Sequence, residues 1–175
     1  LCMRSGKIYA YAPDKFLMSL DTKTGKPLWK THSAETLGAI GNNGRAQGYI
    51  RGFSTTAYMK CNDDYLFFAG PQRSRLAVLS AKDGSLAWKS DAVTSALNVV
   101  TVGERFIFSN ALRGKGNVYD HKTGKVVASI GHNYAFCRFT MSEPYVLGAN
   151  MDICLLYTSY AADDLTRLTS CCVCF

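Results

Sequence analysis

Four basic side chains have the types and positions that favour binding of a ligand. Arg45 and Arg51 lie in a long segment that carries five glycines, and Lys60 and Arg138 lie in apolar segments that we expect to be strands. Guanidinium and ammonium groups bind anions through charge-assisted hydrogen bonds, and such exposed contacts weaken as salt rises. The sequence therefore predicts a candidate ligand-binding set of Arg45, Arg51, Lys60 and Arg138. Two alternatives stay open: Lys60 and Arg138 form structural ion pairs, and the glycine-rich segment merely covers an edge.

The sequence holds none of the motifs typical of common catalytic sites. There is no Gly-x-Ser-x-Gly, no His-Glu-x-x-His and no ordered set of Ser, His and Asp. The segment "GKGN" at 114–117 is too short to cradle a phosphate, and each histidine lacks a second ligand at a useful spacing. We interpret Asp63 and Asp64 as part of a turn that precedes a strand, rather than as ligands of a calcium ion. We therefore predict no catalytic residue and no metal site in this chain.

The seven cysteines divide into two groups. Cys2, Cys61 and Cys137 have no zinc-site spacing, and we expect them to be small buried hydrophobic residues. Residues 154–175, "CLLYTSYAADDLTRLTSCCVCF", lack glycine, proline and strand alternation, and resemble the adapter read-through that ends some environmental gene fragments. We predict that 154–175 is a non-native tail, and that its cysteines have no function: Cys154, Cys171, Cys172 and Cys174.

Charge and hydropathy limit the classes of partner. The net charge is +7, but the 20 basic residues are scattered through turns rather than clustered, so we expect no nucleic-acid binding. No apolar run approaches the roughly 18 residues of a membrane span. The first residue is Leu and no leader follows it, so we expect an internal piece of a longer protein. The classes of partner that we still expect are another protein and an anionic ligand.

One turn pattern occurs three times. The segments are "SLDTKTGKPLW" at 19–29, "VLSAKDGSLAW" at 78–88 and "VYDHKTGKVVA" at 118–128. The turn glycines Gly25 and Gly84 are 59 residues apart, and Gly84 and Gly124 are 40 apart. A period of about 40 to 45 residues with four short strands per unit is typical of the blades of a β-propeller.

Short apolar strands flank each turn. Each repeat unit begins with a run of aromatic and β-branched residues, at 7–12, 65–70 and 105–110. Each run is followed by a second run, the turn and a last short strand. Inner strands are expected at 57–62 and 135–142, and helical periodicity is not sustained over three turns. Residues 1–153 are therefore predicted to be all-β, a partial β-propeller of four-stranded antiparallel blades, about three blades plus part of a fourth.

The repeated residues have a physical explanation in the turn. Glycine adopts positive φ without steric cost, aspartate accepts hydrogen bonds from turn amides, and serine does so more weakly. A tryptophan four residues after the glycine can pack on a neighbouring blade. We assign the motif a structural role, with these positions: Asp21, Gly25, Trp29, Gly84, Trp88, Asp120 and Gly124.

The pattern over about residues 6–153 resembles the pyrroloquinoline-quinone-like repeat, Ala-x-Asp-x-x-Thr-Gly-x-x-x-Trp. The first segment matches with Ser19 in place of Ala, the second keeps the Gly and Trp, and the third has Ala128 in place of Trp. The resemblance implies a β-propeller and a periplasmic or other extracytoplasmic location. The family includes quinoprotein alcohol and glucose dehydrogenases, an outer-membrane assembly lipoprotein and many propellers with no known cofactor.

A quinoprotein dehydrogenase needs a catalytic carboxylate, a cation such as calcium and aromatic faces around the quinone. Both tryptophans are assigned to the turn motif, and no such carboxylate can be placed. We therefore expect a non-enzymatic binding or scaffold module with no cofactor. One alternative is part of a quinone-dependent dehydrogenase, with pyrroloquinoline quinone and calcium, whose active-site blades lie outside this chain. Another is a cell-envelope assembly factor that binds partner strands at a sheet edge.

Overall fold

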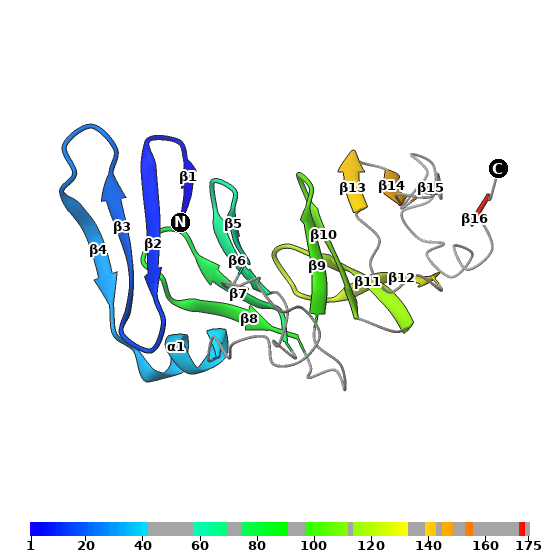
Figure 1. Ribbon diagram of the computed structural model, residues 1–175, viewed down its shortest axis with the longest axis horizontal. Coiled ribbons are helices and arrows are strands. Elements are labelled where there is room, and N and C mark those ends of the chain that lie inside the picture. The colour runs from blue at the N-terminus through cyan, green and yellow to red at the C-terminus, as the bar shows by residue number, and fades with distance from the viewer. Residues whose placement is uncertain are drawn as a thin grey trace, which may run out of the picture. The chain divides into compact units, whose positions relative to one another are not determined.

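The structure is a computed structural model that describes residues 1–41, 58–69, 75–90, 97–111, 114–132, 139–142, 145–148, 153–155 and 172–173 (Figure 1). The chain divides into two compact units, Leu1–Ala96 and Leu97–Phe175. No helix in the described ranges is both long and apolar enough to cross a membrane.

The first unit contains two antiparallel sheets of four strands, each ordered as in the chain. The first sheet consists of β1 (Cys2–Arg4), β2 (Lys7–Ala12), β3 (Phe16–Asp21) and β4 (Pro27–Thr31). The second consists of β5 (Tyr58–Cys61), β6 (Tyr65–Ala69), β7 (Ala77–Ser80) and β8 (Leu86–Lys89). Successive strands pair as neighbours, which is the meander expected of a propeller blade.

The second unit repeats this arrangement. One sheet holds β9 (Leu97–Val102), β10 (Phe106–Ala111), β11 (Gly114–Asp120) and β12 (Val126–His132). The other holds β13 (Phe139–Ser142), β14 (Tyr145–Gly148), β15 (Ile153–Leu155) and the short β16 (Cys172–Val173). In the fourth sheet β16 pairs with β15 through Ile153–Val173 and Cys154–Cys172. The predicted all-β fold, a partial propeller of four-stranded antiparallel blades, is confirmed.

A short helix occupies part of the segment between the first two sheets, where the sequence predicts only a glycine-rich loop. Helix α1 (Ala34–Ile40) begins at Ser33, whose Oγ accepts a hydrogen bond from the Thr36 amide at 3.4 Å. Gly41, with φ of 74°, follows its last residue. Seven residues make about two turns, too few for the periodicity on which helix prediction depends.

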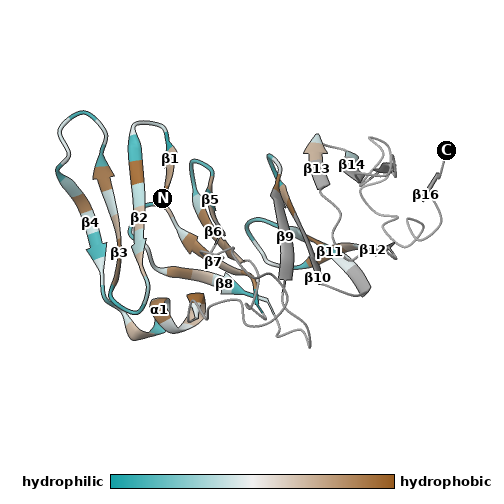
Figure 2. Cartoon of the chain, viewed as in Figure 1, coloured by the Kyte–Doolittle hydropathy of each residue, from teal (hydrophilic) through white to brown (hydrophobic). Residues whose placement is uncertain are grey.

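The core of the first unit lies between its two sheets. Tyr9 and Leu17 of the first sheet and Ile40 of α1 pack with buried residues of the second sheet and its turn: Leu66, Phe68, Ala77, Leu79 and Ala81. Figure 2 shows hydrophobic residues along β6 and β7 and in α1. Since β6 and β7 are buried on successive residues, the second sheet is covered on both faces.

The repeated turns have the predicted geometry. Gly25, Gly84 and Gly124 have φ of 67°, 76° and 68°. Asp21 Oδ1 accepts hydrogen bonds from the Lys23 amide at 3.0 Å and from the Thr24 amide at 2.7 Å. In the second turn Ser80 Oγ accepts one bond, from the Lys82 amide at 3.2 Å. Ser80 therefore accepts from a turn amide, as the sequence predicts.

Trp29 joins the first sheet to the turn of the second. Its indole Nε1 donates to the Ala81 carbonyl at 3.2 Å, and its ring lies against Gly84 so closely that a Cβ there would stand 2.6 Å from Cζ3. Thr36 Oγ1 of α1 donates to the Gly84 carbonyl at 3.3 Å. The predicted packing of a motif tryptophan on the neighbouring blade is thus confirmed for Trp29. Trp88 is partly buried, and its role between blades stays a prediction.

Candidate functional site

Of the four predicted ligand-binding residues, the structure places one. Lys60 lies on β5, while Arg45, Arg51 and Arg138 lie outside the described residues. Met59 and Cys61, its neighbours on β5, pack against the core of the first unit, so strand alternation puts Lys60 on the opposite face. Partial burial lowers the pKa of the Lys60 amine from its usual range. Whether the four residues form one site stays a prediction.

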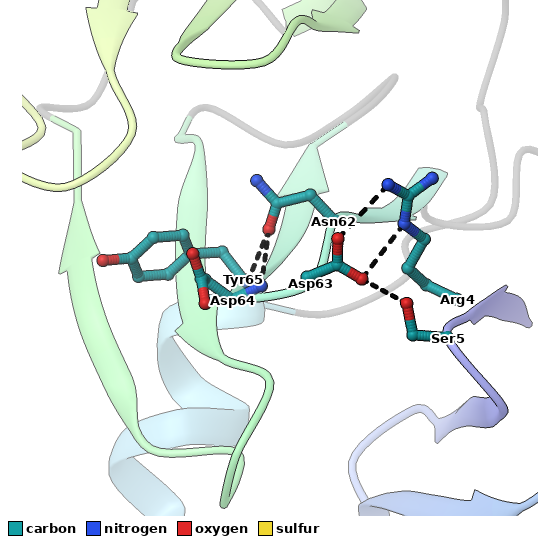
Figure 3. Close-up of polar contacts among 6 residues, drawn as sticks. All are labelled: Arg4, Ser5, Asn62, Asp63, Asp64 and Tyr65. Carbon is teal, nitrogen blue, oxygen red and sulfur yellow. Dashed lines mark hydrogen bonds and ion pairs between the residues drawn. The ribbon is translucent and has the colours of Figure 1, made fainter.

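Polar contacts gather where β1 and β5 end, in a group we call the β1–β5 turn cluster: Arg4, Ser5, Asn62, Asp63, Asp64 and Tyr65 (Figure 3). The Arg4 guanidinium binds the Asp63 carboxylate with two hydrogen bonds, from Nε to Oδ1 and from Nη2 to Oδ2, each 3.2 Å long. The Ser5 hydroxyl donates to the same Oδ1. These contacts join the first strands of the two sheets.

Asn62 shapes the turn that presents Asp63. Its Oδ1 accepts from the backbone amides of Asp64 at 3.0 Å and Tyr65 at 2.7 Å, and the backbone N–H of Asn62 donates to the Tyr65 carbonyl at 3.0 Å. The predicted turn at Asp63 and Asp64 is therefore confirmed. This side-chain cap leaves the Asp63 carboxylate outside the turn, where Arg4 reaches it.

The charges of this cluster favour a structural tie over acid–base chemistry. The hydrogen bonds from Arg4 and then Ser5, with the field of Arg4, lower the pKa of Asp63. Asp63 in turn raises the pKa of Arg4. A general base works best with a pKa near the working pH, so a carboxylate with a lowered pKa is a poor one. Both side chains are about half exposed, which lets water and salt screen the pair.

Two thiols lie beside this cluster. Cys2 and Cys61 are partly buried and pack against the same core. Burial, the hydrogen-bonding contact with Cys61 and the charge of Cys61 raise the pKa of the Cys2 thiol. No group of three or more His, Cys, Asp or Glu side chains in the described part of the chain is arranged to hold a metal ion.

Sequence reasoning missed the Arg4–Asp63 pair and the pairing of Cys2 with Cys61. A usable signal was present, because both pairs are 59 residues apart, the same spacing that separates Gly25 and Gly84. Equivalent positions of adjacent blades lie side by side in a propeller, so the repeat length itself identifies residues that meet.

Comparisons with known proteins agree with this architecture. A family model, PQQ_2, described as "Outer membrane protein assembly factor BamB", matches residues 2–133. No curated protein matches the chain. The crystal structure of the computationally designed Ika8 protein is similar at 16% identity and a TM-score of 0.65, over 90% of this chain and 45% of that one.

Two further structures are similar at low identity. The designed Ika4 protein has 14% identity and a TM-score of 0.60, over 86% of this chain and 84% of that one. BamB from Moraxella catarrhalis has 13% identity and a TM-score of 0.48, over 86% of this chain and 42% of that one. With 45% of the Ika8 chain covered, this chain spans less than half the length of that protein. Because the family model covers most of the sequence, the chain belongs to the PQQ_2 family of pyrroloquinoline-quinone-like repeat proteins.

Proposed function

We propose that this chain is a non-enzymatic binding or scaffold module of a β-propeller that acts outside the cytoplasm on a protein partner. One observation carries the proposal: the aspartates with a shifted pKa serve the architecture. Asp21, Asp83 and Asp120 accept hydrogen bonds inside their own turns, and Asp63 binds Arg4. The pKa of each is lowered, the reverse of what a general acid or a neutral-pH base requires.

The family supports a protein partner. The matching family model carries the description of an outer membrane protein assembly factor, which suggests work on other polypeptides in the cell envelope. The proposed contact residues are Lys60 with Arg45, Arg51 and Arg138, and their positive charge favours an acidic or anionic surface. Binding through such charges is expected to be weak and sensitive to salt.

The test compares this role with the dehydrogenase alternative. The chain is titrated with pyrroloquinoline quinone and calcium while absorbance is recorded, and dye-linked oxidation of small alcohols and sugars is then assayed. In parallel, a labelled extended peptide of alternating apolar and acidic residues is titrated at low and high salt. We expect peptide binding that weakens with salt, and no stoichiometric absorbance shift. A quinone-dependent shift with turnover would instead establish the enzyme.

Lys60 supplies a specific variant. Lys60→Gln should lower affinity for the acidic peptide, since it removes a cation from the first strand of the second sheet. Lys82→Gln is the matched control, because Lys82 is an exposed lysine in the turn of the same sheet. If both variants and the parent chain bound the peptide with equal affinity, Lys60 would not be part of the binding surface.

A further inference from the structure

Cys2 and Cys61 come together from the first strands of two adjacent sheets. Cys2 lies on β1 and Cys61 on β5, and these two strands contact each other. Both side chains are partly buried and pack against the same hydrophobic core. The two thiols therefore face the same space between the sheets and keep part of their surface open.

The β1–β5 turn cluster fixes how the two strands are aligned. The Arg4–Asp63 ion pair lies two residues beyond each cysteine, and its two hydrogen bonds are each 3.2 Å long. Cys2 and Arg4 are the two ends of β1, whereas Asp63 lies in the turn that follows Cys61, the last residue of β5. The tie therefore holds the end of β1 beside the end of β5, and the thiols of Cys2 and Cys61 lie within hydrogen-bonding contact of each other.

We propose that Cys2 and Cys61 are a redox-responsive pair, which forms a disulfide between the first two blades when the protein meets a disulfide oxidant. One thiolate attacks the oxidant disulfide, forms a mixed disulfide and releases one thiol. The second cysteine, as a thiolate, then attacks the mixed disulfide at the protein sulfur and releases the second thiol. Two electrons and two protons pass in total from the cysteines to the oxidant, which is reduced to two thiols.

Burial raises the pKa of the Cys2 thiol, so only a small fraction of Cys2 is thiolate at neutral pH. The thiolate is the attacking species in thiol–disulfide exchange, so formation of the bond should become faster as pH rises. Either cysteine can make the first attack, because both thiols keep part of their surface open.

Peptide mapping of the unmodified chain tests the bond directly. Trypsin cleavage after Arg4, Lys60 and Arg73 gives the peptides 1–4 and 61–73, each with one cysteine. After incubation with oxidised glutathione and alkylation, we expect these peptides linked to each other, and separate after dithiothreitol. The oxidised chain should melt roughly 5–10 °C higher, because the bond restricts the unfolded chain. Alkylation of both cysteines after oxidation would overturn the proposal.

Single substitutions test the pairing. Cys2→Ser and Cys61→Ser should each collect a stable glutathione adduct on the remaining cysteine of the pair, because no second thiol is left to resolve the mixed disulfide. Cys137→Ser is the control and should still yield the linked peptides. A stable adduct on Cys61 of the unmodified chain, without linked peptides, would show that the two sulfurs do not meet.

Discussion

The Asp120 carboxylate shows how much of a turn one side chain can hold. Its Oδ1 accepts from the amides of Lys122 and Thr123 at 3.0 and 2.9 Å and from the Thr123 hydroxyl at 3.0 Å. We expect Asp120→Ala to lower the free energy of unfolding by about 1–2 kcal/mol in urea titrations, since these donors lose their partner. Asp120→Asn keeps an Oδ1 acceptor and should lose less. Equal losses in both variants would mean that charge, rather than acceptor geometry, stabilises the turn.

Gly84 meets two demands at once, and Gly25 meets only one. Both have positive φ, but a Cβ on Gly84 would stand 2.6 Å from the Trp29 ring, while a Cβ on Gly25 would meet nothing within 4 Å. Gly25→Ala should therefore cost about 1–2 kcal/mol through backbone conformation alone. Gly84→Ala should cost about 1–3 kcal/mol more, because the methyl group overpacks the joint between the blades.

The comparison of these two glycines is measured by urea unfolding monitored through tryptophan fluorescence. Trp29→Phe in the Gly84→Ala background is the relevant control, since the smaller ring leaves space for the added methyl group. If Gly25→Ala and Gly84→Ala lower the free energy of unfolding equally, the close contact with Trp29 does not add to the cost of a side chain at residue 84.

At the level of elements, β4 depends on Trp29 to join the first sheet to the second. The ring packs against the shared core and also contacts Tyr9, with centroids 6.2 Å apart. Trp29→Ala should lower the free energy of unfolding by about 2–4 kcal/mol. This loss is smaller than that expected for a fully buried tryptophan, because the Trp29 side chain is only partly buried. Trp29→Phe should cost less and lose mainly the hydrogen bond to Ala81, worth about 1 kcal/mol. If Trp29→Ala lost less free energy of unfolding than Trp29→Phe, the ring would not be what joins the two sheets.

The strands and turns were predictable because their signals are local. Alternating apolar residues and the glycine of the β3–β4 hairpin predict β2, β3 and β4, and the same pattern predicts their counterparts around Gly84 and Gly124. Helix α1 was not predictable from periodicity, since its cap at Ser33 and its contact with the second sheet supply what seven residues lack. No local pattern encodes the Arg4–Asp63 pair, whose residues are 59 apart, so only the length of the repeat could have indicated it.

For the whole molecule, the role of residues 154–175 is open to a simple test. These residues contribute Cys154 and Leu155 of β15 and both residues of β16. We expect that a chain ending at Ile153 has unchanged solubility and an unchanged urea midpoint, because the composition of the segment is unlike that of the repeats. A clear loss of stability on truncation would show that the segment packs as a native part of the fourth sheet.

Stability of the whole molecule should depend on acid through its turn aspartates. The pKa values of Asp21, Asp63, Asp83 and Asp120 are lowered in the folded chain by hydrogen bonds and neighbouring cations. In the unfolded chain they return to about 3.9, so protons bind the unfolded state more strongly. The stabilisation is therefore complete above about pH 4–5 and is lost as pH falls through the lowered folded values. Urea midpoints should be nearly constant from pH 7 to 5 and fall below about pH 4.

The acid dependence has an internal control in Asp63. Asp63→Asn removes one carboxylate with a lowered pKa, so its urea midpoint should fall less steeply below about pH 4 than that of the parent chain. Added salt should reduce the difference between the two chains, because the Arg4–Asp63 pair is about half exposed and ions screen it. A midpoint that stays constant or rises below pH 4 would mean that the turn carboxylates contribute nothing to the stability of the propeller.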